Sequence, residues 1–328
     1  MNIRINQPQG FSEEGRKTNQ EDSLFPMLGS ATANTRVWLV CDGMGGHENG
    51  EVASACVART VGEALTARNV VTCQQAQQLF EQALDTAYQE LDRLDHSDEK
   101  ARKMGTTLTL LMLCSDGAFI AHIGDSRVYQ MRKGTGVVFQ THDHSLLNDL
   151  LAAGELDEES AKTFPQKNVI TRAVQPHQEY PAKASYRVIT DVRKGDVFFL
   201  CCDGVVEKLD NKDLCDLLLT DQPLEKRVES LKNECHERDT RDNYSCYAIE
   251  VEAVEGAVRT IPQNNQMGET VVMPEKKKLN CKVWTLLFLF IFLVILLLGW
   301  KLKHDNPASE LQEREHVEHV NGTINRNN

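Results

Sequence analysis

Two long segments near the start of the chain carry apolar residues at the spacing of an amphipathic helix. In residues 51–68 the apolar positions are 52, 55, 56, 57, 61, 64 and 65, and in residues 75–94 they recur at helical intervals from 76 to 94. This spacing places the apolar side chains on one side of a helix, where they can pack against a core. The pattern therefore predicts two long helices.

Beyond residue 105 the pattern changes to short apolar runs separated by turn residues. The runs predict strands at 106–114, 118–123, 126–132 and 137–140, joined by the turns at 115–117 and 133–136. Further buried strands are expected at 36–41, 196–202 and 244–250, and further helices at 144–153, 211–219 and 224–238. Long helices beside hairpins are typical of an α+β domain and not of an alternating βαβ fold.

The strongest hydrophobic signal lies near the C-terminal end. Residues 283–300 carry no charge, and Thr285 and Gly299 are the only residues among them that are not hydrophobic. As a helix the segment spans roughly 27 Å, close to the hydrocarbon thickness of a bilayer. Trp284 and Trp300 stand at its two ends, where interfacial aromatic residues belong. This predicts one transmembrane helix, and the basic flanks disfavour the alternative of a buried core helix.

That segment defines the domain organisation. Residues 1–255 are long enough for one folded domain. We expect residues 256–282 to form a flexible basic linker and residues 301–328 to form a short polar tail. Lysines 276, 277, 278 and 282 precede the span, and lysines 301 and 303 follow it. Because an excess of positive charge favours the cytoplasmic side, we expect a single-pass protein in the lipid bilayer with its domain in the cytoplasm. In a Gram-negative cell this would be the inner membrane.

Composition narrows the class of protein. Hydrophobic residues make up 41% and charged residues 26% of the chain, which is globular composition. Residues 1–255 hold 27 Lys and Arg against 41 Asp and Glu, and this acidic excess argues against nucleic acid as a partner. The ten cysteines show no C-x-x-C spacing and the N-terminus shows no signal peptide. Both features indicate a reducing compartment.

Acidic residues recur where the predicted strands begin or end. They are Glu21, Asp22, Asp42, Asp125, Asp203 and Asp242. A strand end holds a carboxylate rigidly, and a neighbouring glycine lets the backbone approach a ligand. Hard cations such as Mg²⁺ and Mn²⁺ bind several convergent oxygen donors. A single Asp-Gly pair more often marks a turn, but the recurrence favours a cation-binding cluster.

Eight short motifs follow one another in a fixed order along the chain. They are Asn19-Gln20-Glu21-Asp22-Ser23, Val40-Cys41-Asp42-Gly43-Met44-Gly45-Gly46-His47, Met104-Gly105-Thr106-Thr107, Ile123-Gly124-Asp125-Ser126-Arg127, Thr141-His142-Asp143-His144-Ser145, Asn168-Val169-Ile170-Thr171-Arg172-Ala173, Leu200-Cys201-Cys202-Asp203-Gly204 and Arg241-Asp242-Asn243. In this order they resemble the motifs of the metal-dependent protein phosphatases of the PPM, or protein phosphatase 2C-like, family in its bacterial form. The resemblance implies two packed, mainly antiparallel β-sheets flanked by helices. It also implies a metal cleft at one edge of the sheets.

The resemblance further implies hydrolysis of phosphoserine and phosphothreonine in proteins by a water that bridges two Mg²⁺ or Mn²⁺ ions. Asp42 matches the carboxylate that bridges both ions, and Gly43 matches the residue that gives its carbonyl to one of them. Glu21 and Asp22 match the first acidic pair, with Glu21 the better match for a direct ligand.

The remaining metal positions follow in the same way. Asp203 and Asp242 match the ligands of the other ion, and Asp125 matches an acid that helps a third, weaker ion to bind. The implied partners are phosphorylated proteins and a cognate serine/threonine kinase. Two rival functions are a membrane-anchored pseudophosphatase, which binds phosphorylated partners without turnover, and a phosphatase for small phosphoesters.

The position of the phosphate clamp departs from the family pattern. Members of the family have an arginine five residues before Asp22, where this chain has Lys17, with Arg16 one residue further away. Lysine is a point charge and lacks the two-pronged geometry of arginine. The sequence leaves open which of the two residues contacts phosphate.

Overall fold

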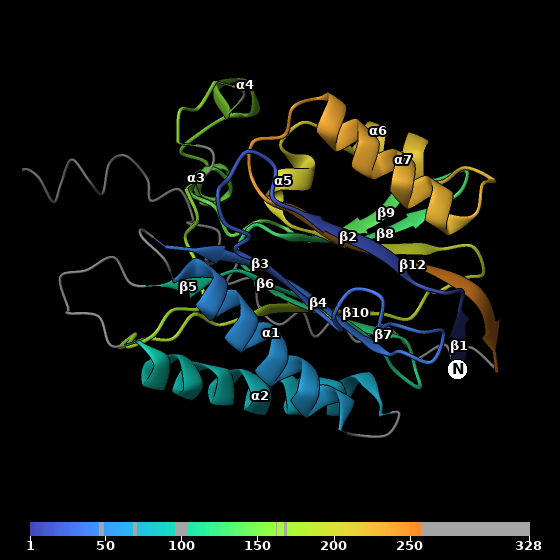
Figure 1. Ribbon diagram of the computed structural model, residues 1–328, viewed down its shortest axis with the longest axis horizontal. Helices are drawn as coiled ribbons and strands as arrows, with labels where there is room; N and C mark the ends of the chain where they lie inside the picture. Colours follow the sequence, from blue (N-terminus) through green and yellow to red (C-terminus); the bar gives the residue numbers. More distant parts are fainter. Residues whose placement is uncertain (46–48, 68–70, 96–103, 162, 167–168, 257–328) are drawn as a thin grey trace, which may run out of the picture. The chain divides into compact units, whose positions relative to one another are not determined.

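The computed structural model describes residues 1–45, 49–67, 71–95, 104–161, 163–166 and 169–256 (Figure 1). All of them belong to one compact unit, Met1–Pro262. The linker from residue 257 onward, the predicted transmembrane helix over 283–300 and the tail over 301–328 lie outside the described residues. Within the described part of the chain, no helix combines the length and the apolar character that crossing a bilayer requires.

Two β-sheets built from antiparallel pairs form the centre of the unit. The first sheet runs in the order β1 (Asn2–Ile5), β12 (Tyr244–Glu255), β11 (Val197–Cys201), β8 (Arg127–Arg132) and β9 (Gly136–Gln140), and β2 (Gln9–Glu13) also pairs with β12. The second sheet runs in the order β10 (Ser185–Ile189), β7 (Ala118–Ile123), β6 (Leu108–Leu113), β4 (Val37–Met44) and β3 (Asp22–Phe25), and β5 (Gly105–Thr106) pairs with the end of β4.

Helices cover the outer faces of both sheets (Figure 1). Helices α1 (Gly50–Thr66) and α2 (Cys73–Leu94) lie against the second sheet, and α6 (Asn211–Leu218) and α7 (Leu224–Glu237) lie over the first. Helices α3 (Leu146–Ala153), α4 (Glu158–Ala161) and α5 (Asp203–Val206) gather at one end. These four layers confirm the predicted α+β architecture of two antiparallel sheets flanked by helices.

The alternation of side chains along β4 shows how the core is divided. Trp38 and Val40 belong to the apolar cluster between the sheets, whereas Leu39 and Cys41 belong to the cluster under α1 and α2. Successive side chains of a strand point to opposite faces. Asp42 therefore points between the sheets, so β4 carries an acidic side chain to the edge of the core.

The long helices begin and end within two residues of their predicted bounds. Helix α2 begins at Cys73, earlier than predicted, because Thr72 and Gln75 form a capping box. In it the Thr72 side chain accepts a hydrogen bond from the Gln75 N–H, and the Gln75 side chain accepts one from the Thr72 N–H. These bonds satisfy amide groups that the first helical turn leaves free.

Strands β1, β2, β3 and β10 were not predicted from the sequence. Each is four or five residues long, and none contains three consecutive apolar residues, whereas the predicted strands β9 and β11, of the same length, do. Their pairing partners lie elsewhere in the chain, since β1 and β2 both pair with β12. Packing against distant residues, and not local propensity, makes them strands.

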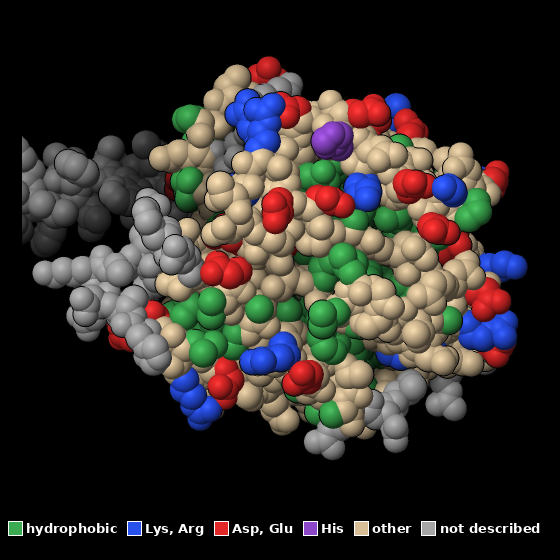
Figure 2. Space-filling view, in the orientation of Figure 1, with side chains coloured by type: hydrophobic (Ala, Val, Ile, Leu, Met, Phe, Trp, Pro, Cys, Tyr) green, Lys and Arg blue, Asp and Glu red, His purple; other side chains and the backbone are tan. Residues whose placement is uncertain are grey.

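Charged side chains of both signs are interspersed over the face shown in Figure 2. Several form ion pairs between exposed residues, such as Arg4 with Glu255 at 3.4 Å and Arg193 with Asp191 at 2.8 Å. Exposed pairs of this kind contribute little to stability. The acidic excess is therefore largely a solvated surface, and the carboxylates that bear on function are the buried ones.

Candidate metal centre

Asp22 and Asp42 face each other across the ends of two neighbouring strands. They are direct partners in the antiparallel pairing of β3 with β4, so their side chains share one face of the second sheet. Asp22 is only 7% exposed, and neither of its carboxylate oxygens has a hydrogen-bond partner among the described residues. Like charges at directly opposite positions repel, so the pair requires protons or a cation.

Two further carboxylates complete the inner part of the site. Asp203 is the first residue of α5, two residues beyond the end of β11 in the first sheet, and Asp125 lies two residues beyond the end of β7 in the second. Each has one oxygen that is buried without a hydrogen-bond partner in the described part of the chain. Both line a cleft of about 490 Å³, whose wall also includes Arg127 and Glu207. The carboxylates therefore meet where the two sheets open to a cleft.

Burial and mutual repulsion raise the pKa of these carboxyl groups. Burial raises the pKa of Asp22 to about 7, and burial together with the charge of Asp203 raises the pKa of Asp125 to about 7. The pKa of Asp42 lies well above its ordinary value, first because of burial and then because of the charges of Asp22, Asp203, Asp125 and Asp242. Buried charges of one sign are stable when they bind a cation. The oxygen-rich donor set without protein partners fits a divalent metal ion.

Glu21 and Gly43 meet at the N-terminal end of α1. The Gly43 N–H donates a hydrogen bond to the Glu21 carbonyl at 3.0 Å. A Cβ atom on Gly43 would lie 2.2 Å from the carbonyl oxygen of Gly50, so only glycine permits this approach. A Cβ on Gly50 would lie 2.8 Å from Glu21 Oε1. Burial raises the pKa of Glu21, and the charge of Lys17 opposes that rise.

Asp242 lies two residues before the start of β12 and pairs with Lys17, whose Nζ is 2.9 Å from Asp242 Oδ1. Burial alone would lower the pKa of Lys17, but this hydrogen bond and the surrounding carboxylate charges raise it. Arg16 instead pairs with Asp239, and both of those side chains are more than half exposed. The structure thus brings Lys17 into the carboxylate cluster and leaves Arg16 outside it. Contact of either residue with phosphate remains a prediction.

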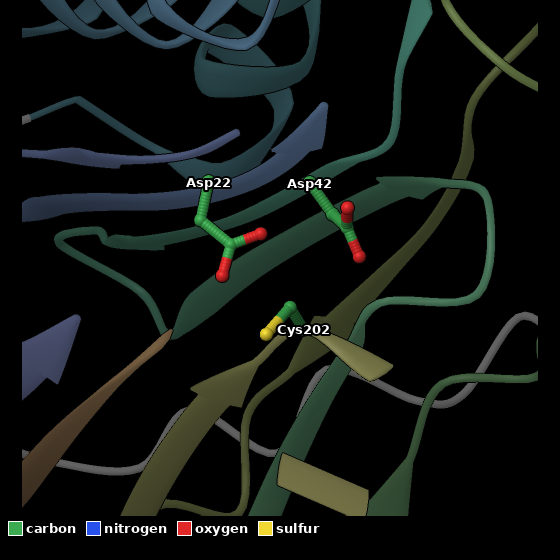
Figure 3. Close-up of side chains that lie close together, drawn as sticks. All are labelled: Asp22, Asp42 and Cys202. Carbon is green, nitrogen blue, oxygen red and sulfur yellow. The ribbon is translucent and has the colours of Figure 1, made fainter. Parts of the chain in front are cut away.

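Three residues that the sequence did not single out bind or approach the cluster. Asn243 Oδ1 accepts a hydrogen bond from the Glu21 N–H at 2.9 Å, and Thr107 Oγ1 accepts one from the Asp42 N–H at 3.0 Å. Cys202 lies beside Asp22 and Asp42 (Figure 3). The only signal for these residues was their place inside the quoted motifs, because residue type alone does not reveal such contacts.

Comparison with known proteins shows what this arrangement resembles. The family model described as protein phosphatase 2C matches residues 9–239. Protein phosphatase PhpP of Streptococcus pneumoniae is 33% identical over 216 residues, which cover 66% of this chain and 85% of the relative. The solved serine/threonine phosphatase of S. agalactiae has a TM-score of 0.66 at 28% identity and covers 75% of this chain and 99% of its own.

A further solved structure is the catalytic domain of the serine/threonine protein phosphatase PstP in complex with two manganese ions. It has a TM-score of 0.60 at 24% identity and covers 76% of this chain and 99% of its own. Fold and site together define a serine/threonine protein phosphatase of bacterial type. The chain belongs to the protein phosphatase 2C family, which confirms the resemblance seen in its motifs.

The raised pKa values predict how the metal-free protein responds to pH. Between about pH 4 and pH 7 the folded state keeps protons on Asp22 and Asp125 that the unfolded state, with ordinary pKa values of 3.8, has released. Stability falls with rising pH wherever the folded state binds more protons. In a chelator, the free energy of unfolding should be lower at pH 7.5 than at pH 5.5 by at least about 1.4 kcal/mol. Urea unfolding followed by circular dichroism measures this difference.

Saturating Mn²⁺ provides the control for this experiment. An ion that binds only the folded state replaces the protons and stabilises the protein most at the higher pH, where the carboxylates are free to bind it. The pH dependence seen in the chelator should therefore shrink or reverse. Equal stability at both pH values in the chelator would contradict the described electrostatics.

Proposed function

We propose that this chain hydrolyses phosphoserine and phosphothreonine in proteins with a water activated at a two-ion Mg²⁺ or Mn²⁺ centre. The observation that carries the proposal is the buried cluster around Asp42, whose neighbouring carboxylate oxygens lack protein partners. Such oxygen-rich clusters suit hard cations. The two manganese ions in PstP belong to that protein and support a centre of the same type here.

The described residues suggest how the ions would be held. Asp42 is central enough to bridge two ions, because the charges of four other carboxylates act on it. The other residues proposed to hold them are Glu21, Asp22, Asp203, Asp242 and the carbonyl of Gly43, with Asp125 available to a third ion. When bound, such ions lower the pKa of water and offset negative charge on the transferred phosphoryl group.

The chain's own groups would orient the substrate. Lys17 is held by Asp242 inside the cluster, so its ammonium group can donate hydrogen bonds to a phosphate oxygen. The cleft beside Asp125 and Asp203 is open to a side chain that carries the phosphate. The rival function, a pseudophosphatase, finds no support in the described residues, because every predicted ligand residue is present there.

Replacing single metal ligands tests the function most directly. Asp42→Asn and Asp203→Asn each remove one charged ligand. We expect both to lower hydrolysis of a phosphothreonine peptide by more than about 100-fold. Even residues that only hydrogen-bond to metal ligands commonly change metal affinity or activity by about 10–100-fold, and a ligand itself should contribute more. Phosphate release at saturating Mn²⁺ measures the loss.

Asp216→Asn is the matched control, because it makes the same chemical change at an exposed carboxylate of α6 that pairs with Lys212. It should leave turnover within about twofold, since exposed pairs contribute little. Near-normal turnover in both ligand variants would remove the proposed reaction. Binding of the phosphopeptide by the wild-type chain without any turnover would instead establish the pseudophosphatase.

The phosphate clamp has its own test. Lys17→Ala should lower phosphopeptide hydrolysis about 10–100-fold, the equivalent of one hydrogen bond to a charged group, whereas Arg16→Ala should have a smaller effect. Lys17→Arg should match or exceed the wild type, because guanidinium donates two parallel hydrogen bonds to phosphate. Values of kcat and KM at saturating Mn²⁺ measure each change. A larger loss in Arg16→Ala would assign the clamp to Arg16.

We also propose that residues 283–300 anchor the enzyme in a membrane, with the catalytic domain in the cytoplasm. The support is the uncharged apolar segment and the excess of lysines before it. Anchoring would confine the enzyme to phosphoproteins near the membrane. A membrane-bound serine/threonine kinase is then the natural source of its substrates.

Protease accessibility tests this topology. In intact spheroplasts that express the chain with a C-terminal epitope, added protease should remove the epitope and spare the catalytic domain, because only residues 301–328 would lie outside. Spheroplasts opened by detergent are the control and should lose both. Digestion of the domain in intact spheroplasts would reverse the orientation, and recovery of the chain in the soluble fraction would remove the anchor.

A further inference from the structure

The carboxylate of Asp125 stands on a short connection between the two sheets. Residues 124–126 join β7 of the second sheet to β8 of the first, so the chain crosses between the sheets within three residues. The charges of Asp203 and Asp143 both act against ionisation of Asp125. Rotation of the turn would relieve this repulsion by moving the carboxylate away from the cleft. Other contacts must therefore hold the turn in place.

Both backbone groups of Gly124 are bonded to one residue, His144. The His144 N–H donates to the Gly124 carbonyl at 3.0 Å, and the Gly124 N–H donates to the ring nitrogen Nδ1 of His144 at 3.1 Å. Gly124 has a φ of 100°, a conformation that favours glycine, and a Cβ atom there would lie 2.6 Å from Thr107 Cγ2. The turn that carries Asp125 is thus bonded to His144 and packed against Thr107.

The same turn is tied to the centre of the carboxylate cluster. Thr107 Oγ1 lies 2.7 Å from Ser126 Oγ and accepts a hydrogen bond from the Asp42 N–H at 3.0 Å. The supports of Asp42 and Asp125 are therefore connected through two hydroxyl groups. Within this arrangement, His144 is the contact that comes from outside the cluster.

The ring of His144 is fixed in the orientation that its bond to Gly124 requires. It stacks on the His122 ring, with centroids 4.5 Å apart and planes 9° apart, and its Nε2 lies 2.9 Å from Ser185 Oγ. Nδ1 accepts a hydrogen bond only without a proton, so Nε2 carries the proton and donates it to Ser185. Burial, followed by the charges of His122 and of Arg172, lowers the pKa of His144 to about 3. The ring is therefore neutral at neutral pH, as the bond demands.

We propose that His144 is a positioning residue for Asp125, and that its Nδ1 thereby sets how tightly the third ion of the metal centre binds. The pair of hydrogen bonds between His144 and Gly124 carries this inference. Groups that orient metal ligands commonly change metal affinity by about 10–100-fold. The alternative is a buried histidine that only fills the space beside His122. The inference rests on the proposed metal centre, but not on turnover of a phosphopeptide.

Two conservative variants separate the two ends of the ring. In His144→Asn the side-chain oxygen takes the place of Nδ1 and can accept from the Gly124 N–H, but the side chain does not reach Ser185. In His144→Gln the amide reaches toward Ser185 and leaves no acceptor opposite Gly124. His144→Gln should therefore weaken the third Mn²⁺ binding step by about tenfold or more, whereas His144→Asn should stay within about threefold of the wild type.

Electron paramagnetic resonance of free Mn²⁺, during titration of the metal-free full-length chain, measures each binding step. The two tighter steps should change by less than about twofold in both variants, because their ligands do not depend on Gly124. A histidine with only a structural role would weaken all steps together or none. In an Asp125→Asn background, which already lacks the ligand, His144→Gln should add no further loss.

His236→Gln is the matched control, because it makes the same change at an exposed histidine of α7. It should bind Mn²⁺ as the wild type does. A measurement on the wild type serves if a His144 variant does not fold. In nuclear magnetic resonance spectra recorded with diamagnetic Mg²⁺, the third step should shift the Gly124 amide and the His144 Nδ1 resonances.

Three results would overturn the positioning role. They are a third step of undiminished affinity in folded His144→Gln, the absence of a third step in the wild type, and resonances of Gly124 and His144 that do not respond to that step. If the expected binding pattern is found in a protein that does not hydrolyse phosphopeptides, the proposed function fails and the positioning role stands.

Discussion

Repulsion among buried carboxylates is the constraint on which the rest of the structure depends. Asp22 is buried and Asp42 and Asp203 are partly buried; the charges of Asp22 and Asp203 raise the pKa of Asp42, and the charge of Asp203 also raises the pKa of Asp22. In a medium of low dielectric this repulsion would push the strands apart. Close backbone contacts hold the loops in place, such as the approach of Gly43 to Gly50. The fold thereby maintains a concentration of negative charge that a divalent cation relieves.

The site depends on the packing of one sheet against the other. Asp22 and Asp42 belong to the second sheet, while Cys202 and Asp203 follow a strand of the first. Their spacing is fixed by the apolar cluster between the sheets, in which side chains of β4 and β11 interlock. A change deep in that cluster can therefore alter metal affinity without touching a ligand.

The sequence by itself determined the features that depend on neighbouring residues. Helical spacing predicted α1 and α2 to within two residues of their bounds, and recurring carboxylates at strand ends identified Asp42, Asp125 and Asp203 as candidate ligands. Only the tertiary structure decided that Cys202 meets Asp22, that Lys17 and not Arg16 enters the cluster, and that β1 and β2 are strands. The periodicity of apolar residues predicts which face of a helix or strand a residue occupies. Contact between residues that are distant in the sequence depends instead on how the two sheets pack, and local sequence patterns do not predict that packing.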